Sequence, residues 1–113
     1  MELYNKENLK VLKDSLLDDS YYMPKGLFQS NKNLRLETKL AYVAILDTLL
    51  KKANFNQDGI AMLKRDNPMI MATLEKLANK DVDKDKMEKY FDELCEANLI
   101  EINKQDIFVY QVD

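Results

Sequence analysis

The chain has 113 residues, a net charge of −3 and no histidine, and 46% of its residues are hydrophobic while 33% are charged. This length and balance indicate one globular domain with a core of its own, and they exclude a disordered chain. No apolar run is long enough to span a membrane and no secretory signal opens the sequence, so we expect a cytoplasmic protein.

The first predicted helix spans residues 5–18, with Asn5 as its N-cap. Leucines recur along it at helical spacing and give it one apolar face. We assign residues 1–20 to an N-terminal arm and residues 21–113 to the main domain, and we expect the arm to support a homodimer. The leucines of this apolar face are Leu9, Leu12, Leu16 and Leu17.

Residues 36–53 form the longest predicted helix, and apolar side chains cover more than half of its circumference. A helix of this kind lies in the middle of a domain. A turn at residues 57–59 and a short strand at residues 60–63 follow. Asn67 as N-cap and Pro68 at the first helical position then predict the start of the next helix.

The C-terminal part of the chain is expected to hold a last helix and a β-hairpin. A turn at residues 80–83 precedes the helix at 84–97. Strands at 99–102 and 107–112 follow, joined by a turn at 103–106. A long buried helix followed by helix, turn, helix and hairpin is the order of a winged helix-turn-helix domain. We therefore predict a mainly α fold with a small β-hairpin and an extra N-terminal helix. The predicted core residues are Leu40, Ile45, Leu49, Ile70, Leu74, Leu77, Met87, Phe91 and Leu94.

Residue patterns that usually carry catalysis or bind metals are missing from this sequence. It has no Gly-rich phosphate loop and no Cys/His spacing of a metal site. Cys95 is the single cysteine and is interpreted as a small buried hydrophobic residue. Asp81, Asp83 and Asp85 alternate as in a calcium loop, but Lys86 stands where such a loop needs glycine. We therefore expect no enzyme, no metal and no cofactor.

One stretch of the sequence resembles a known family. Residues 22–28 read YMPKGLF, and residues 34–42 read LRLETKLAY. They resemble the N-terminal domain of RepA-type replication initiators from plasmids of low-GC Gram-positive bacteria. That family opens with an aromatic-x-x-Pro-Lys-x-Leu-Phe segment and then a helix start that carries Leu, Lys and Tyr. The resemblance implies a dimeric winged helix, encoded by a plasmid or phage, that binds repeated sites on double-stranded DNA at a replication origin.

The expected DNA-reading elements are the helix at 84–97 and the hairpin turn at 103–106. A winged helix places the second helix of its motif in the major groove and its hairpin against the backbone or minor groove. Lysines there would neutralise phosphates, and helix N-termini offer free N–H groups to flanking phosphates. The candidate contacts are Lys80, Lys84, Lys86 and Lys89, Lys104 and Gln105 at the hairpin tip, Lys64 and Arg65 before Asn67, and Lys25, which forms a second cationic set with Lys32, Arg35 and Lys39.

The charge of the last helix favours a different class of function. Residues 80–97 contain four lysines and seven acidic residues. Carboxylates repel the same phosphates that the lysines attract, and nucleic-acid-binding domains are usually basic. The alternative is an acidic protein-binding module, an inhibitor or adaptor of phage or plasmid origin. It would keep the winged-helix fold without binding DNA and would hold a partner through its acidic face.

Overall fold

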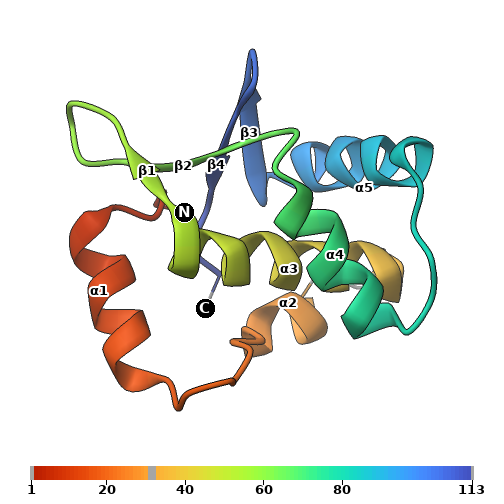
Figure 1. Cartoon of the computed structure of the whole chain (residues 1–113), viewed down its shortest axis with the longest axis horizontal. Helices are drawn as coiled ribbons and strands as arrows, with labels where there is room; N and C mark the ends of the chain where they lie inside the picture. Colours follow the sequence, from red (N-terminus) through yellow and green to blue (C-terminus); the bar gives the residue numbers. More distant parts are fainter. Residues whose placement is uncertain (1, 31–32, 113) are drawn as a thin grey trace.

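The computed structural model describes residues 2–30 and 33–112. Figure 1 shows helices around a small antiparallel sheet, and none of the helices in the described ranges is long and apolar enough to cross a membrane. The helices are α1 (Lys6–Ser15), α2 (Lys25–Ser30), α3 (Leu36–Lys52), α4 (Pro68–Ala78) and α5 (Lys84–Glu96), and the strands are β1 (Asn54–Phe55), β2 (Ala61–Lys64), β3 (Ile100–Asn103) and β4 (Asp106–Val109).

Helix α3 forms the centre of the fold, as its apolar circumference predicted. Every residue from Ala41 to Leu49 is buried. Helices α4 and α5 and strand β2 all pack against it, and Figure 1 shows it running through the middle of the molecule. Burying a helix on all sides requires partners for its polar residues. Thr48 meets this need by donating to the carbonyl of Ala44 at 2.9 Å, and Asp47 by pairing with Lys51.

The sheet is larger than the hairpin that the sequence predicts. Its strands lie in the order β1-β2-β4-β3, all antiparallel. Strands β3 and β4 form the predicted hairpin, with a turn of only two residues, Lys104 and Gln105. Strand β2 then joins the other edge of β4, with Leu63 opposite Ile107. The strand predicted at residues 60–63 corresponds to β2, but its pairing with the hairpin was missed, because pairing between β2 and β4 is long-range and leaves no local turn signal.

Asparagine caps start α1 and α4 where the sequence predicts them, and an aspartate caps α5. The side chain of Asn5 accepts a hydrogen bond from the N–H of Asn8 at 2.9 Å, and the side chain of Asn8 accepts one from the N–H of Asn5 at 2.7 Å. Asn67 accepts from the N–H of Met69 at 2.9 Å, with Pro68 at the first position. Asp83 caps α5. By contrast, α2 was not predicted, because its six residues are too few to show helical periodicity.

The N-terminal segment is attached to the sheet and the core. The N–H of Tyr4 donates to the carbonyl of Val109 at 2.8 Å, and the N–H of Ala61 donates to the carbonyl of Tyr4 at 3.0 Å. Leu9 is buried and Leu12 packs against the same core.

The predicted N-terminal helix was too long, because α1 ends at Ser15 and leaves Leu16 and Leu17 beyond it, with Leu17 82% exposed. The part of the leucine face that lies on α1 is used within this chain. The homodimer stays a prediction, without this face as its argument.

The hydrophobic core follows the predicted register. Seven of the nine predicted core residues are buried, whereas Leu40 and Leu77 are half-buried at its edge. Tyr42, Leu46 and Tyr90 are additional buried residues that the prediction missed. Burying a tyrosine hydroxyl is costly unless it forms a hydrogen bond, and both tyrosines form one. Tyr42 donates to the carbonyl of Tyr110, and Tyr90 donates to the carboxylate of Glu37.

Phe91 provides the sharpest test of this packing. It is 2% exposed, and Phe91→Ala should lower the free energy of unfolding by about 3–5 kcal/mol, since a buried ring is lost and a cavity remains. Urea denaturation of the two proteins measures the difference. Leu36→Ala is the matched control, because Leu36 is 62% exposed. Equal stability of Phe91→Ala and the wild type would show that the register of α5 is wrong.

Candidate nucleic-acid interface

A groove of about 680 Å³ lies where α4 begins, between α5 and the tip of the β3–β4 hairpin. Its walls combine apolar and polar side chains. Phe91 and Met87 come from α5, and Lys84 lies at the start of that helix. Gln105 at the hairpin tip closes the other side. The sequence-predicted reading helix and wing therefore meet at one surface.

The hairpin tip is fixed to the segment that leads from β2 into α4. The N–H of Arg65 donates to the carbonyl of Gln105 at 2.7 Å. One residue earlier, the ammonium of Lys64 lies 2.9 Å from the carboxylate of Asp106. Lys104, in the turn itself, has a φ of 59° and an exposed side chain. These bonds hold the β3–β4 hairpin at a defined place beside α4 and α5.

Arg65 lines the groove, and its charge is already paired with a carboxylate of the same chain. Its guanidinium pairs with the carboxylate of Glu88 and lies over the ring of Phe91, 5.6 Å from the ring centre. The hydrogen bond to Glu88 raises the pKa of Arg65. This residue therefore holds α5 against the β2–α4 segment and brings positive charge into the groove already matched by a carboxylate.

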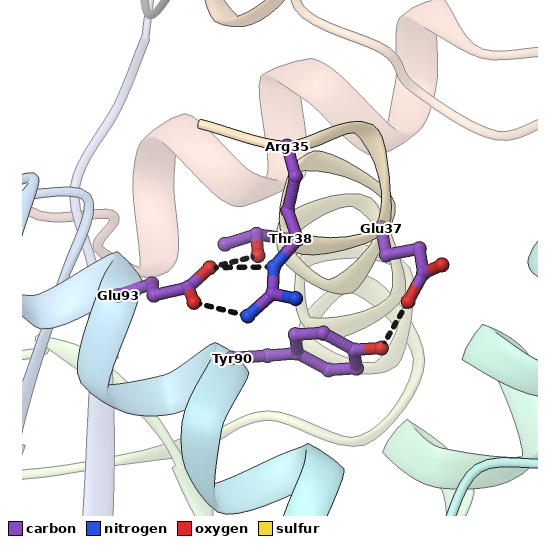
Figure 2. A network of polar contacts seen from close by, with 5 residues as sticks. All are labelled: Arg35, Glu37, Thr38, Tyr90 and Glu93. Atoms are coloured by element: carbon purple, nitrogen blue, oxygen red, sulfur yellow. Dashed lines mark hydrogen bonds and ion pairs between the residues drawn. The ribbon is translucent and has the colours of Figure 1, made fainter. Parts of the chain in front are cut away.

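A second network joins α5 to the start of α3 (Figure 2). The guanidinium of Arg35 pairs with Glu93, with its Nε 3.1 Å from the carboxylate, and lies over the ring of Tyr90 at 5.5 Å. The hydroxyl of Thr38 donates to the same carboxylate. The hydrogen bond from Arg35 lowers the pKa of Glu93. Arg35 at the start of α3 and Glu93 of α5 therefore neutralise each other and hold the two helices together.

The network continues through Tyr90 to Lys80. The Tyr90 hydroxyl donates to Glu37, and the ammonium of Lys80 pairs with the other oxygen of that carboxylate. The hydrogen bond from Lys80 lowers the pKa of Glu37, and burial raises the pKa of Tyr90 to about 12. Helices α3 and α5 and the α4–α5 turn are therefore held together by one chain of polar contacts.

The predicted contact residues separate into two groups in the structure. Within the described ranges, those without an ion pair are Lys84, Lys86 and Lys89 of α5, Lys104 and Gln105 of the turn, and Lys25 at the start of α2, all exposed. Lys64, Arg65 and Lys80 are held in ion pairs.

The second cationic set does not form one surface. Arg35 pairs with Glu93, and Lys39 is only 9% exposed, with its ammonium 5.8 Å from the ring centre of Phe28. In Figure 1, α2 lies on the opposite side of α3 from α5, so Lys25 is separated from the α5 lysines. Lys32 falls outside the described residues.

Ion pairs change the charge that α5 presents to solvent. The helix carries three lysines and five carboxylates, but Arg65 and Arg35 neutralise Glu88 and Glu93. Three lysines then face three carboxylates, Asp85, Asp92 and Glu96. All three lysines lie in the first half of the helix, and Lys84 lines the groove. Arg35 and Arg65 lie 58 and 23 residues from their partners, so counting charges along the sequence misses this cancellation.

Cys95 lies half-buried on α5, and burial raises the pKa of its thiol. That direction leaves the thiol protonated at neutral pH. The Asp81–Asp85 stretch is used locally, since Asp83 accepts from the N–H of Lys86 at 2.8 Å. Among the residues that the structure describes, no three His, Cys, Asp or Glu side chains are placed to hold a metal ion.

Comparison with known proteins gives two structural neighbours. No family model and no curated protein matches this chain. One neighbour is a Rep–DNA complex, with 26% identity over 98% of this chain and 83% of that chain, and a TM-score of 0.60. The chain has a Rep-like fold. The second neighbour is an MDR initiator, which has the same fold with a TM-score of 0.61 and 22% identity, over 100% of this chain and 88% of that chain.

The ion pair between Arg35 and Glu93 predicts a pH dependence of stability. Because the folded state lowers the pKa of Glu93, the pair stabilises the Rep-like fold above the ordinary range of a glutamate and is lost as the pH falls through the lowered value. The stability gap between wild type and Glu93→Gln should be widest near neutral pH and close as the pH falls through the lowered pKa of Glu93. Urea denaturation across this range measures it. Glu96→Gln, which removes a carboxylate of α5 without breaking an ion pair, should show a smaller gap.

Proposed function

We propose that this chain is a DNA-binding winged-helix domain of the kind found in replication initiators. The observation that carries the proposal is a groove of a Rep-like fold lined by unpaired Lys84 of α5 and by Gln105 of the hairpin tip. Lys86 and Lys89 on the same helix and Lys104 in the same turn are exposed and carry no ion pair in the described ranges. One neighbour with this fold is a Rep–DNA complex. In this proposal α5 enters the major groove and the β3–β4 hairpin lies against the backbone.

The individual residues take different parts in this proposed complex. Lys84, Lys86 and Lys89 neutralise phosphates on either side of the groove that α5 enters, and each adds to the salt dependence of binding. Lys104 and Gln105, at the tip of the β3–β4 hairpin, contact the DNA backbone. Lys64, Arg65 and Lys80 act mainly by holding these elements in place, because their charges are already paired. Lys25 would reach only flanking DNA.

The finer parts of the proposal rest on the resemblance noted in the sequence. They are that the DNA is a repeated site at a plasmid or phage origin and that the chain binds it as a homodimer. A dimer matches the two-fold symmetry of paired half-sites on a duplex. Static light scattering of the free and DNA-bound chain measures this stoichiometry.

The outer face of α5 supports a second candidate function. Asp92 and Glu96 lie on the second half of the helix, exposed and without an ion pair in the described part of the chain. An acidic protein-binding module would use this face to attract a basic partner and speed its association. The neutralisation of Glu88 and Glu93 weakens this alternative, because it removes two of the charges on which it depends.

Lysine substitutions in α5 test the DNA function directly. Lys84→Ala and Lys86→Ala should each weaken duplex binding and lower the slope of log K against log salt by about one. Lys76→Ala, at an exposed position of α4, is the matched control and should leave the slope unchanged. Fluorescence anisotropy with a labelled random-sequence duplex, over a salt series, measures both quantities.

The charge of Asp85 separates the two candidate functions. For a DNA binder, Asp85→Asn should tighten duplex binding, because it removes an anion next to the lysines of α5. For an acidic protein binder, duplex affinity is absent from the start. The DNA proposal is refuted if the wild type shows no binding at about 50 mM salt and about 10–100 μM protein, conditions in which even non-specific affinity is visible.

A further inference from the structure

A second groove, far from α5, gathers lysines around an exposed aromatic ring. It has a volume of about 320 Å³ and lies between α1, the end of α3 and strand β1. Lys6, Lys10 and Lys13 of α1 line one wall, Lys51 stands on the other, and Phe55 lies at one end. Figure 1 places α1 and α5 at opposite ends of the longest axis of the molecule.

Helix stability accounts for only part of the lysines of α1, since Lys13 in the last turn suits the helix dipole but the row as a whole does not. Lys6, Lys10 and Lys13 are spaced i, i+4 and i+7, so they form a row on one face. Like charges at these spacings repel one another and destabilise a helix. Lys6 also lies in the first turn, where the helix dipole disfavours a cation. A polyanion lying along the row would reverse both effects.

The spacing of this row suits a phosphodiester backbone. With a rise of about 1.5 Å per residue, successive lysines lie about 4.5–6 Å apart along the helix axis. Their flexible stems can bring the ammonium groups to successive phosphates of one strand. Glu7 and Asp14, the two carboxylates of α1, lie three residues before and four residues after Lys10. They offset part of the repulsion from one side of the row and leave its other side to a ligand.

Phe55 adds a flat apolar surface to the same groove. Its side chain is 40% exposed although it is a large hydrophobic residue. Strand β1 holds it in place, with Phe55 opposite Ala61, and the N–H of Lys6 donates to the carbonyl of Gly59 in the adjoining turn at 2.9 Å. These backbone contacts place Phe55 in the same groove as Lys6, at the beginning of the lysine row, with its side chain partly exposed to a ligand.

We propose that this groove binds single-stranded DNA, with Lys6, Lys10 and Lys13 on the phosphates and a base stacked on Phe55. A basic track with an aromatic platform is the physical requirement for binding a single strand. A duplex keeps its bases paired and stacked, so it offers none to the ring. An acidic peptide would use the lysines but not Phe55. The choice of DNA as the polyanion rests on the proposed function.

Anisotropy titration of the full chain with a labelled oligo(dT) of about 15 nucleotides tests the proposal. Phe55→Ala should weaken binding about 10-fold through the lost stacking, and Phe55→Tyr should restore it. Lys10→Gln should lower the salt slope by about 0.7, the value for one phosphate contact on a single strand. Lys76→Gln is the charge-matched control on α4, and thermal melting verifies that each variant is folded.

Results with a duplex of the same length distinguish this inference from the proposed function. Lys84→Ala should weaken duplex binding and leave oligo(dT) binding intact, whereas Phe55→Ala should do the reverse. Loss of duplex binding alone would remove the proposed function and keep the groove. Three outcomes overturn the inference: no oligo(dT) binding at about 50 mM salt, equal binding by Phe55→Ala and wild type, or an equal effect of Phe55→Ala on both DNAs.

Discussion

The complete burial of α3 is the constraint on which the rest of the structure depends. A helix with every residue from Ala41 to Leu49 buried leaves no side for solvent, so helices and sheet must cover it from all directions. This requirement places α4 and α5 on it and brings β2 beside the hairpin. It also explains why the N-terminal segment joins the sheet, since Tyr4 and Leu9 complete the cover.

The position and the buried face of α5 follow from this packing, and polar contacts then restrain its rotation about its own axis. Phe91 and Leu94 fix which face is buried. Arg35 on one side and Arg65 on the other then grip Glu93 and Glu88, and each guanidinium also covers an aromatic ring of the same helix. The two arginines restrain the helix from both flanks. The surface that α5 turns towards a partner is therefore set by residues outside the helix.

Local signals in the sequence were sufficient for most elements and insufficient for the interface. Asn5, Asn67 and Asp83 are caps that act within three residues, and the α3 pattern reports burial directly, so every helix except the short α2 could be predicted. Strand β1 has two exposed residues and no periodicity to detect. The pairing of Arg35 with Glu93 spans 58 residues. Contacts of that range depend on the fold, so the electrostatics of the interface could not be derived from the sequence.

The net charge of the chain says little about what either groove can bind. Ions screen exposed charges over about 10 Å at 0.1 M salt, and the molecule extends over 32 × 31 × 25 Å. The lysines at the start of α5 and the row on α1 lie at opposite ends of the long axis, so each is screened from the other and from most carboxylates. A phosphate interacts with the local balance of positive and negative charge. At α5 internal ion pairs remove two carboxylates from this balance, and at α1 helical spacing brings three lysines onto one face. A chain with a net charge of −3 can therefore present two separate cationic surfaces.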